Sequence, residues 1–262
     1  MLKMLYILKS YLKFLYNSKN EHGVHSPFVF SLVTKCFYDK KKYPEYTILK
    51  GYRNSLLQNK STIEVTDFGA GSRVFKSNKR QISKIAKTAG ISPKRADLLF
   101  RIVNYFQPEN ILEIGTSLGL ATTALALGNK KAKIISLEGC PNTINQCQLQ
   151  LQKFNINNVE CVNTEFSSYL SNFQLPTSNF QLIYFDGNHS KKATLDYFEL
   201  LLPKIANDSV WIFDDIHWSK EMEEAWEIIK NHSKVTVTID TFQWGIVFFR
   251  KEQEKEHFVI RA

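Results

Sequence analysis

The sequence predicts an α/β fold with a mostly parallel sheet and helices on both of its faces. From residue 110 onward, short apolar runs alternate with longer amphipathic segments, a pattern typical of parallel strands joined by helices. The last two apolar runs, 235–239 and 245–250, are separated by a segment too short for a crossover helix. We therefore expect them to form a C-terminal antiparallel hairpin at the edge of a seven-stranded sheet. A chain of 262 residues is long enough for one such core.

The first eighty residues are expected to form a basic, mainly helical extension, and residues 81–262 the main domain. The formal net charge is +9, and residues 1–60 contribute eleven Lys/Arg against three Asp/Glu. This extension is interpreted as a possible lid or dimerisation segment. Its charge also leaves contact with nucleic acid or with an anionic membrane open.

Residues 1–16 are expected to form an amphipathic helix that packs on its own domain or on a second copy of the chain. Lysines interrupt the apolar residues, so the segment is too charged for a signal peptide and too short to span a bilayer. Weak contact with a membrane surface is the alternative. The four cysteines show no CxxC or metal-finger spacing, which indicates reduced thiols in a cytoplasmic protein.

A glycine-containing run at residues 63–72 resembles a nucleotide-binding turn but lacks the helix that should follow. The next residues are polar and basic. We therefore interpret Asp67-Phe68-Gly69-Ala70-Gly71 as a loop of the extension. Two helices are expected within residues 81–106, the second starting at Ser92-Pro93 and ending before Pro108.

A buried strand, a tight turn and a helix start are predicted within residues 110–127. The apolar run ends at Glu113, and Gly115 and Gly119 then enclose Thr116 and Ser117. Glycines at such a turn allow a ligand to approach the backbone closely, and the helix N-terminus offers unpaired N–H groups. The turn is therefore the expected centre of a ligand site.

Strands and helices alternate regularly after this turn. We expect strands at 133–138, 159–163, 180–186 and 209–214, and helices at 140–154, 165–172, 191–202 and 221–232. In open parallel sheets, ligands bind outside the carboxyl ends of the strands. Acids stand at these ends: Glu113, Glu138, Asp186, Asp214 and Asp215. Five acids in register are hard to explain by packing alone.

Glu138 follows Glu113 at the distance where a second-strand acid meets a ribose diol in nucleotide-binding sheets. The turn carries two glycines in GxxxG spacing, and this differs from the GxGxxG of dinucleotide sites. A nucleoside ligand without a pyrophosphate is therefore favoured.

The runs ILEIGTSLG, ISLEG, IYFDGNH and IFDDIHW, in this order and spacing, resemble the class I S-adenosylmethionine-dependent methyltransferases. Within this class the sequence is similar to the cation-dependent, catechol-type O-methyltransferases of small molecules. The resemblance covers roughly residues 82–250. It implies a Rossmann-like sheet and methyl transfer to a hydroxyl of a small molecule.

The resemblance also implies a set of cofactor-binding residues at the strand ends. The Gly115–Gly119 turn would approach the methionine part, Glu138 the ribose, and the region of Thr164-Glu165-Phe166 the adenine. The full set is Glu113, Gly115, Thr116, Ser117, Gly119, Glu138, Gly139, Thr164 and Asp186.

Asp186, Asp214 and Asp215 match the three metal-ligand positions of the resembled family. An all-oxygen set suits Mg²⁺, or alternatively Ca²⁺, which would orient the hydroxyl and lower its pKa. The family often has Asn where this chain has Asp215, and a Lys or Asp shortly after the first metal Asp, where this chain has Asn188-His189-Ser190-Lys191-Lys192. His189, beside Asp186, is therefore the candidate general base. Without a metal ion, Asp214 and Asp215 would surround the amino group of the cofactor.

Three other functions stay open. A nucleic-acid methyltransferase would use the basic extension, although Asp186-Gly187-Asn188-His189 is not the Asn/Asp-Pro-Pro-aromatic motif of amino-group enzymes. A serine hydrolase would use Ser117 in G-x-S-x-G, with Asp186 or Asp214 and His217. A non-catalytic binding module would keep only the fold. Trp218, next to the acid pair, is a candidate for the substrate pocket, and the sequence does not name the methyl acceptor.

Overall fold

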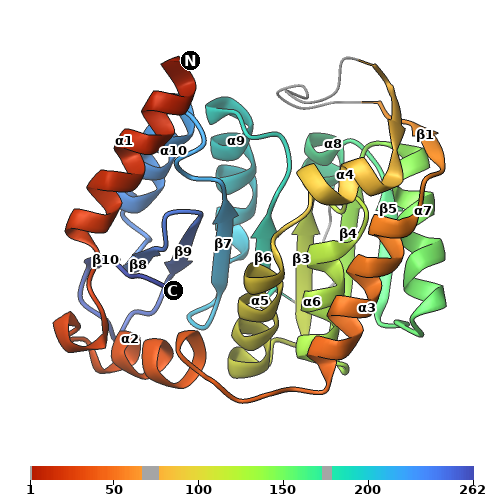
Figure 1. Cartoon of the computed structure of the whole chain (residues 1–262). Coiled ribbons are helices and arrows are strands. Elements are labelled where there is room, and N and C mark those ends of the chain that lie inside the picture. Colours follow the sequence, from red (N-terminus) through yellow and green to blue (C-terminus); the bar gives the residue numbers. More distant parts are fainter. Residues whose placement is uncertain (1, 67–76, 173–178) are drawn as a thin grey trace.

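The computed structural model describes residues 2–66, 77–172 and 179–262, and it has an eight-stranded sheet at its centre (Figure 1). In sheet order the strands are β10 (Glu256–Val259), β8 (Val237–Asp240), β9 (Trp244–Phe248), β7 (Val210–Asp214), β6 (Leu182–Phe185), β3 (Asn110–Ile114), β4 (Lys133–Glu138) and β5 (Val159–Asn163). Strands β5, β4, β3, β6 and β7 are parallel to one another. Their carboxyl ends therefore meet at one edge.

The predicted hairpin is confirmed, but the predicted count of seven strands is one short. Strands β8 and β9 are antiparallel, and β9 pairs with β7. The additional strand β10 pairs in parallel with β8, so the hairpin lies one strand inside the edge. Strand β10 escaped prediction because it is short and half polar, and only one of its four residues, Phe258, is buried. A separate antiparallel pair, β1 (Thr62–Glu64) and β2 (Lys79–Gln81), is also short and largely exposed.

Helices cover both faces of the sheet, as the sequence predicts (Figure 1). Alternate residues of one strand join different cores: Ile111 belongs to one hydrophobic cluster, and Leu112 belongs to the other. On the side of Ile111 lie α3 (Glu45–Gln58), α4 (Ile82–Thr88), α5 (Pro93–Phe106) and α6 (Leu120–Gly128). On the side of Leu112 lie α8 (Phe166–Asn172), α9 (Lys191–Leu201) and α10 (Lys220–Asn231). Helix α7 (Pro141–Lys153) contacts β4 and β5, and its buried residues Cys147 and Leu151 belong to the cluster of Ile111.

The N-terminal segment folds onto the sheet. Helix α1 (Leu2–Asn17) lies beside α10 (Figure 1), and α2 (Pro27–Leu32) starts at Ser26, whose Oγ accepts the N–H of Val29 at 3.4 Å. Residues from α2 and α3 share one hydrophobic cluster with the sheet. The domain boundary after residue 80 stays a prediction. The predicted Asp67–Gly71 loop lies outside the described residues.

Helix α1 confirms the expected amphipathic helix. Its inner face packs on the body, where the rings of Tyr11 and Phe14 lie 4.8 and 5.5 Å from that of Phe242. Its outer face exposes Leu5, Leu8 and Leu12. Self-association through this face stays a prediction. Among the described residues, no helix has the length and apolar character needed to cross a membrane.

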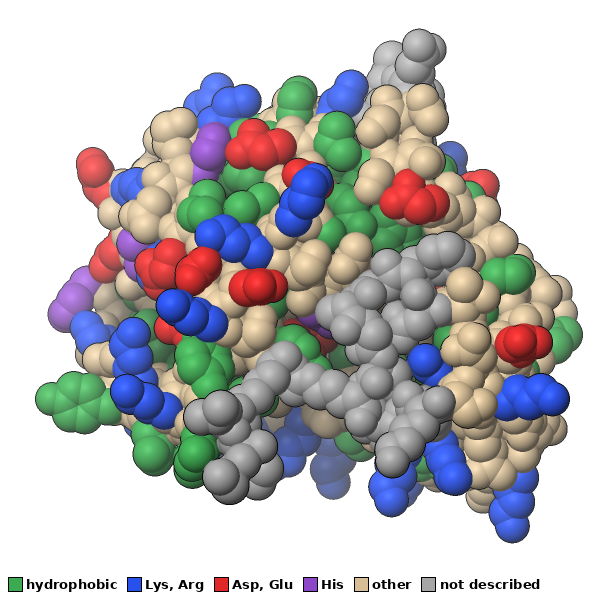
Figure 2. Space-filling view, turned by 90° about the horizontal axis from the view of Figure 1, so that it is seen from above, with side chains coloured by type: hydrophobic (Ala, Val, Ile, Leu, Met, Phe, Trp, Pro, Cys, Tyr) green, Lys and Arg blue, Asp and Glu red, His purple; other side chains and the backbone are tan. Residues whose placement is uncertain are grey.

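Charged side chains of both signs are interspersed on the face seen in Figure 2. Apolar side chains lie between them in the same view. This view looks down from above Figure 1, so it shows only one face of the molecule.

Candidate active site

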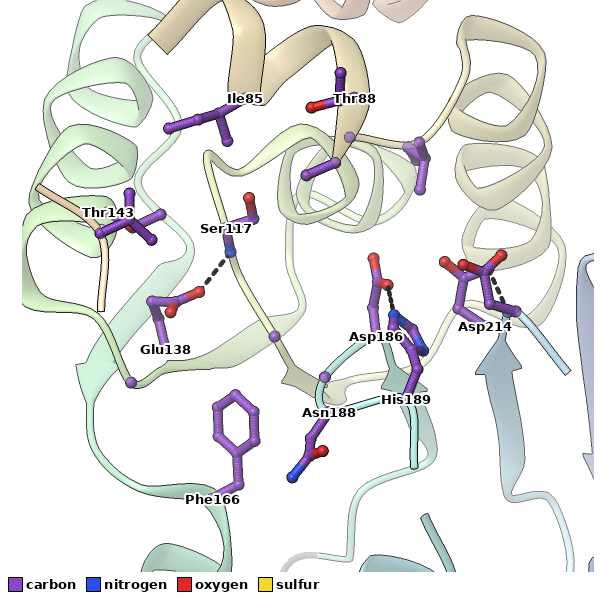
Figure 3. Close-up of a pocket in the computed structure, with 18 of the residues that line it drawn as sticks. Ile85, Thr88, Ser117, Glu138, Thr143, Phe166, Asp186, Asn188, His189 and Asp214 are labelled. Carbon is purple, nitrogen blue, oxygen red and sulfur yellow. Dashed lines mark hydrogen bonds and ion pairs between the residues drawn. The ribbon is translucent and has the colours of Figure 1, made fainter. Parts of the chain in front are cut away.

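A cavity of about 420 Å³ opens at the carboxyl ends of β3, β4, β6 and β7 (Figure 3). The carboxyl ends of parallel strands meet at one edge of a sheet, and the predicted site residues follow these strands. The predicted residues that line the cavity are Gly115, Ser117, Glu138, Gly139, Thr164, Asp186, His189, Asp214, Asp215 and Trp218. The structure therefore gathers side chains from strands that lie up to a hundred residues apart in the sequence.

The glycine turn after β3 depends on its two glycines. Gly115 has a φ of +105°, and a Cβ added there would lie 2.4 Å from the carbonyl oxygen of Asp186. Gly119 has a φ of +79°, and a Cβ would lie 2.4 Å from the hydroxyl of Tyr52 and 2.5 Å from Sγ of Cys147. Both positions therefore combine a left-handed backbone with close contacts that other residues cannot accept.

Glu138 is fixed at the wall of the cavity by two backbone N–H groups (Figure 3). Its Oε2 accepts the N–H of Ser117 at 2.8 Å, and its Oε1 accepts the N–H of Cys140 at 3.0 Å. Each carboxylate oxygen has more than one acceptor position. The bonds thus orient a carboxylate that is suited to accepting hydroxyl groups from a ligand.

Three residues predicted to bind the cofactor lie behind the turn and are not among the described residues that line this cavity: Glu113, Thr116 and Gly119. Glu113 is fully buried and accepts hydrogen bonds from the hydroxyls of Thr122 and Ser136. The hydroxyls of Thr116 and Ser136 lie 2.6 Å apart. Burial raises the pKa of Glu113 to about 8. This network supports the turn from inside the protein.

The side of the cavity opposite the acid cluster is lined by Glu138, Thr143 and the aromatic ring of Phe166. Figure 3 shows Phe166 and Ile85 on opposite sides of the turn that carries Ser117. Phe166 opens α8, where Glu165 accepts the N–H groups of Ser167 and Ser168 at 3.1 and 2.7 Å. A flat, partly apolar slot of this kind suits an aromatic ring.

The predicted acids Asp186, Asp214 and Asp215 lie together on the other wall of the cavity. Asp214 is almost buried and forms an ion pair with Arg95, which α5 contributes. The guanidinium of Arg95 also lies 5.0 Å from the centre of the Trp244 ring. The N–H of Asp215 donates to Oδ1 of Asp214 at 2.9 Å. The acids thus surround a resident arginine.

His189 is held against Asp186, with 3.5 Å between its Nε2 and the carboxylate Oδ1 (Figure 3). Burial, together with the negative charge of Asp214, raises the pKa of Asp186 to about 8. Burial lowers the pKa of His189, but the hydrogen bond and charge of Asp186 outweigh it and raise that pKa to about 9. The pair therefore retains a proton at neutral pH.

Sequence analysis missed Arg95. Its place three residues after Ser92 suggests only a helix start, and the backbone N–H of Arg95 indeed donates to Oγ of Ser92 at 3.3 Å. Its ionic partner Asp214 lies far away in the sequence, so no local pattern signals the pair. Among the described residues, no group of three or more His, Cys, Asp or Glu has an arrangement that could hold a metal ion. As they stand, the predicted ligands do not fit the implied cation.

The hydrolase triad is not assembled. His217 points to other carboxylates, with its Nε2 2.8 Å from Oδ2 of Asp240 and its Nδ1 3.6 Å from Oε2 of Glu223. It is absent from the described lining of the cavity, whereas Ser117 lies on that lining. Ser117 therefore has no histidine base of the predicted kind beside it.

Comparisons with known proteins agree with this architecture. Residues 112–216 match the model of a family described as "Methyltransferase domain". Comparison with curated proteins returned no sequence match. The chain is similar to the solved structure of a methyltransferase from Podospora anserina, PaMTH1, bound to SAH, with 13% identity and a TM-score of 0.62, covering 87% of this chain and 97% of that one.

Two further solved structures have similar scores. An O-methyltransferase from Bacillus cereus in complex with SAH has 17% identity and a TM-score of 0.56, with 82% of this chain and 95% of that chain covered. The O-methyltransferase TomG from Streptomyces achromogenes, involved in tomaymycin synthesis and solved with SAM, has 14% identity and a TM-score of 0.56, with 85% and 95% covered. At these identities the likeness establishes the fold.

Proposed function

We propose that the chain is a class I S-adenosylmethionine-dependent methyltransferase and that it methylates a hydroxyl group of a small molecule. One observation carries the proposal: Glu138 is oriented at the cavity wall by the N–H groups of Ser117 and Cys140. A fixed carboxylate beside a two-glycine turn suits the ribose diol of a nucleoside without phosphates.

The cavity offers places for both reactants. Glu138, Thr164 and Phe166 supply one half, in which the ribose and adenine of S-adenosylmethionine would lie. Asp186 and His189 supply the other half, in which the acceptor would lie. Gly115 also lines the cavity. This arrangement supports a reaction in which the enzyme mainly positions two molecules in line.

The acceptor half contains a group suited to accepting a proton. Attack of the acceptor oxygen on the methyl carbon forms a C–O bond and breaks the C–S bond, so that S-adenosylhomocysteine leaves. The hydroxyl proton passes to the Asp186–His189 pair. Because this pair holds a proton at neutral pH, the rate of transfer is expected to increase with pH as that proton is lost.

The divalent cation implied by the resemblance stays outside this proposal. When bound, such an ion would polarise the acceptor oxygen. Of its predicted ligands, Asp214 already pairs with Arg95. No step of the proposed reaction therefore depends on a metal ion.

Calorimetric titration with S-adenosylmethionine tests the cofactor assignment. We expect binding to the wild type and an affinity roughly 10- to 100-fold lower in Glu138→Gln, because a charged hydrogen-bond acceptor is lost. Glu160→Gln is the matched control, since this exposed glutamate lies on the neighbouring strand β5. Absence of binding to the wild type, or equal affinity in both variants, would contradict the assignment.

A further inference from the structure

The start of α5 delivers a positive charge to the carboxyl edge of the sheet. Ser92 caps the helix, Pro93 opens it, and Arg95 follows in the first turn. The side chain of Arg95 is only 19% exposed and lies against the end of β7, where Asp214 is 5% exposed. The arginine is therefore part of the protein interior at this site.

Arg95 is surrounded by negative charge. It forms an ion pair with Asp214, and the cavity that both side chains line also contains Asp186 and Asp215. A guanidinium is charged at any working pH. Neighbouring carboxylates destabilise one another in a buried site unless a cation offsets their charge. The structure already contains one such cation.

A second contact anchors the guanidinium. It lies 5.0 Å from the centre of the Trp244 ring, and Trp244 is itself buried in the sheet. Stacking on an aromatic face favours a planar guanidinium. The side chain is thus held by Asp214 and by Trp244, which come from the adjacent strands β7 and β9.

Arg95 and a divalent ion would compete for the same carboxylate. An ion that took Asp214 as ligand would place a second cation beside the buried guanidinium and break its ion pair. Breaking a buried pair by removing one partner is strongly destabilising, because it leaves an uncompensated charge. The structure thus favours one resident cation over an exchangeable one.

We propose that Arg95 takes the place that the family resemblance gives to a divalent cation, so that this chain acts without a metal ion. This inference rests on the proposed methyl transfer. Arg95 is here a positioning residue. It holds Asp214 in place and neutralises the acid wall of the cavity, which is formed by Asp186, Asp214 and Asp215 and faces the acceptor. We therefore expect the acid wall to bind a metal ion only after Arg95 is replaced.

Titration of the full chain with Mn²⁺ tests the inference, with the electron paramagnetic resonance signal of the free ion as the measure of binding. Wild type is expected not to bind Mn²⁺ that is added at millimolar concentration. Arg95→Met uncovers the carboxylates and is expected to bind Mn²⁺ at least about tenfold more tightly than wild type. The double variant Arg95→Met/Asp214→Asn is expected to lose this gain.

Two further variants separate the roles of charge and structure. Lys94→Met removes an exposed charge from the same helix turn, so it should behave as wild type. Arg95→Lys keeps the charge and is expected to retain the low Mn²⁺ affinity. Micromolar Mn²⁺ binding by wild type that is lost in Asp214→Asn overturns the inference. So does an Arg95→Met variant that binds S-adenosylhomocysteine and gains no Mn²⁺ affinity.

The two proposals fail in different ways. Calorimetry with S-adenosylhomocysteine in the presence of EDTA is run on a separate aliquot of the same wild-type preparation. If S-adenosylhomocysteine binds and Mn²⁺ also binds tightly at Asp214, the proposed function stands and the role of Arg95 is wrong. If wild type does not bind S-adenosylhomocysteine, the proposed function is itself wrong.

Discussion

His217 is expected to make the stability of the protein fall as the pH rises. Burial lowers the pKa of this imidazole, but its hydrogen bond to Asp240 and its ion pair with Glu223 outweigh burial and raise the pKa to about 9. Glu223 in turn accepts a hydrogen bond from the hydroxyl of Tyr6. The protonated His217 therefore links the end of β8 to α10 and, through Glu223, to α1.

The size of the effect follows from the shift in pKa. A rise from an ordinary 6.5 to about 9 corresponds to about 3 kcal/mol of folding free energy. A group whose pKa is raised on folding contributes its full stabilisation when the pH is below its pKa in the unfolded chain. The contribution is lost as the pH rises through the folded value. Asp240→Asn removes one of the two negative partners, so it should cost about 2 kcal/mol near pH 6 and little at about pH 10.

Urea unfolding of wild type and Asp240→Asn at several pH values measures this difference. Comparing the two proteins at each pH cancels the titration of groups that they share. Asp208→Asn, at an exposed aspartate, is the control for loss of one negative charge. A destabilisation that stays constant with pH, or grows toward high pH, would refute the argument.

Three other substitutions test the turn and the cavity. Gly115→Ala should lower the free energy of unfolding by roughly 2 kcal/mol or more and abolish binding of S-adenosylmethionine, because its Cβ meets the carbonyl oxygen of Asp186; calorimetry and urea unfolding report both. Tyr52→Phe removes a buried 2.9 Å hydrogen bond to the carbonyl of Leu118 and should cost about 1–3 kcal/mol in urea unfolding, whereas an unchanged midpoint would contradict it. Phe166→Ala should weaken S-adenosylmethionine binding about tenfold with little change in unfolding, and unaltered affinity would exclude the ring from the cofactor wall.

Most of the fold could be predicted because its signals are local. The strands from β3 to β9 are mainly apolar runs, and the helices between them have an amphipathic period. Strand β10 gave no such signal, because it adds to the sheet edge mainly through backbone pairing with β8. Only one of its four residues, Phe258, joins the hydrophobic core, so the strand has no continuous apolar pattern.

The site was predicted less completely, since strand-end acids look alike in a sequence. Glu138 and Asp186 line the cavity, whereas Glu113 points behind the turn to Thr122 and Ser136. The alternation along β3 could have indicated this, because side chains of successive strand residues point to opposite faces. The neighbours of Glu113, Leu112 and Ile114, belong to one hydrophobic cluster, so Glu113 points to the opposite face of the sheet. Arg95 could not be found in this way, since its role depends on an ion pair formed only by the folded chain.

Transfer of a labelled methyl group from S-adenosylmethionine is the most direct test of the proposed methylation of a small-molecule hydroxyl. The purified chain is incubated, in the presence of EDTA, with a panel of small hydroxylated molecules and, separately, with RNA. We expect label to appear as a methyl ether on a small molecule, and we expect Glu138→Gln to lower the rate. Label on RNA with none on the small molecules would contradict the proposed acceptor.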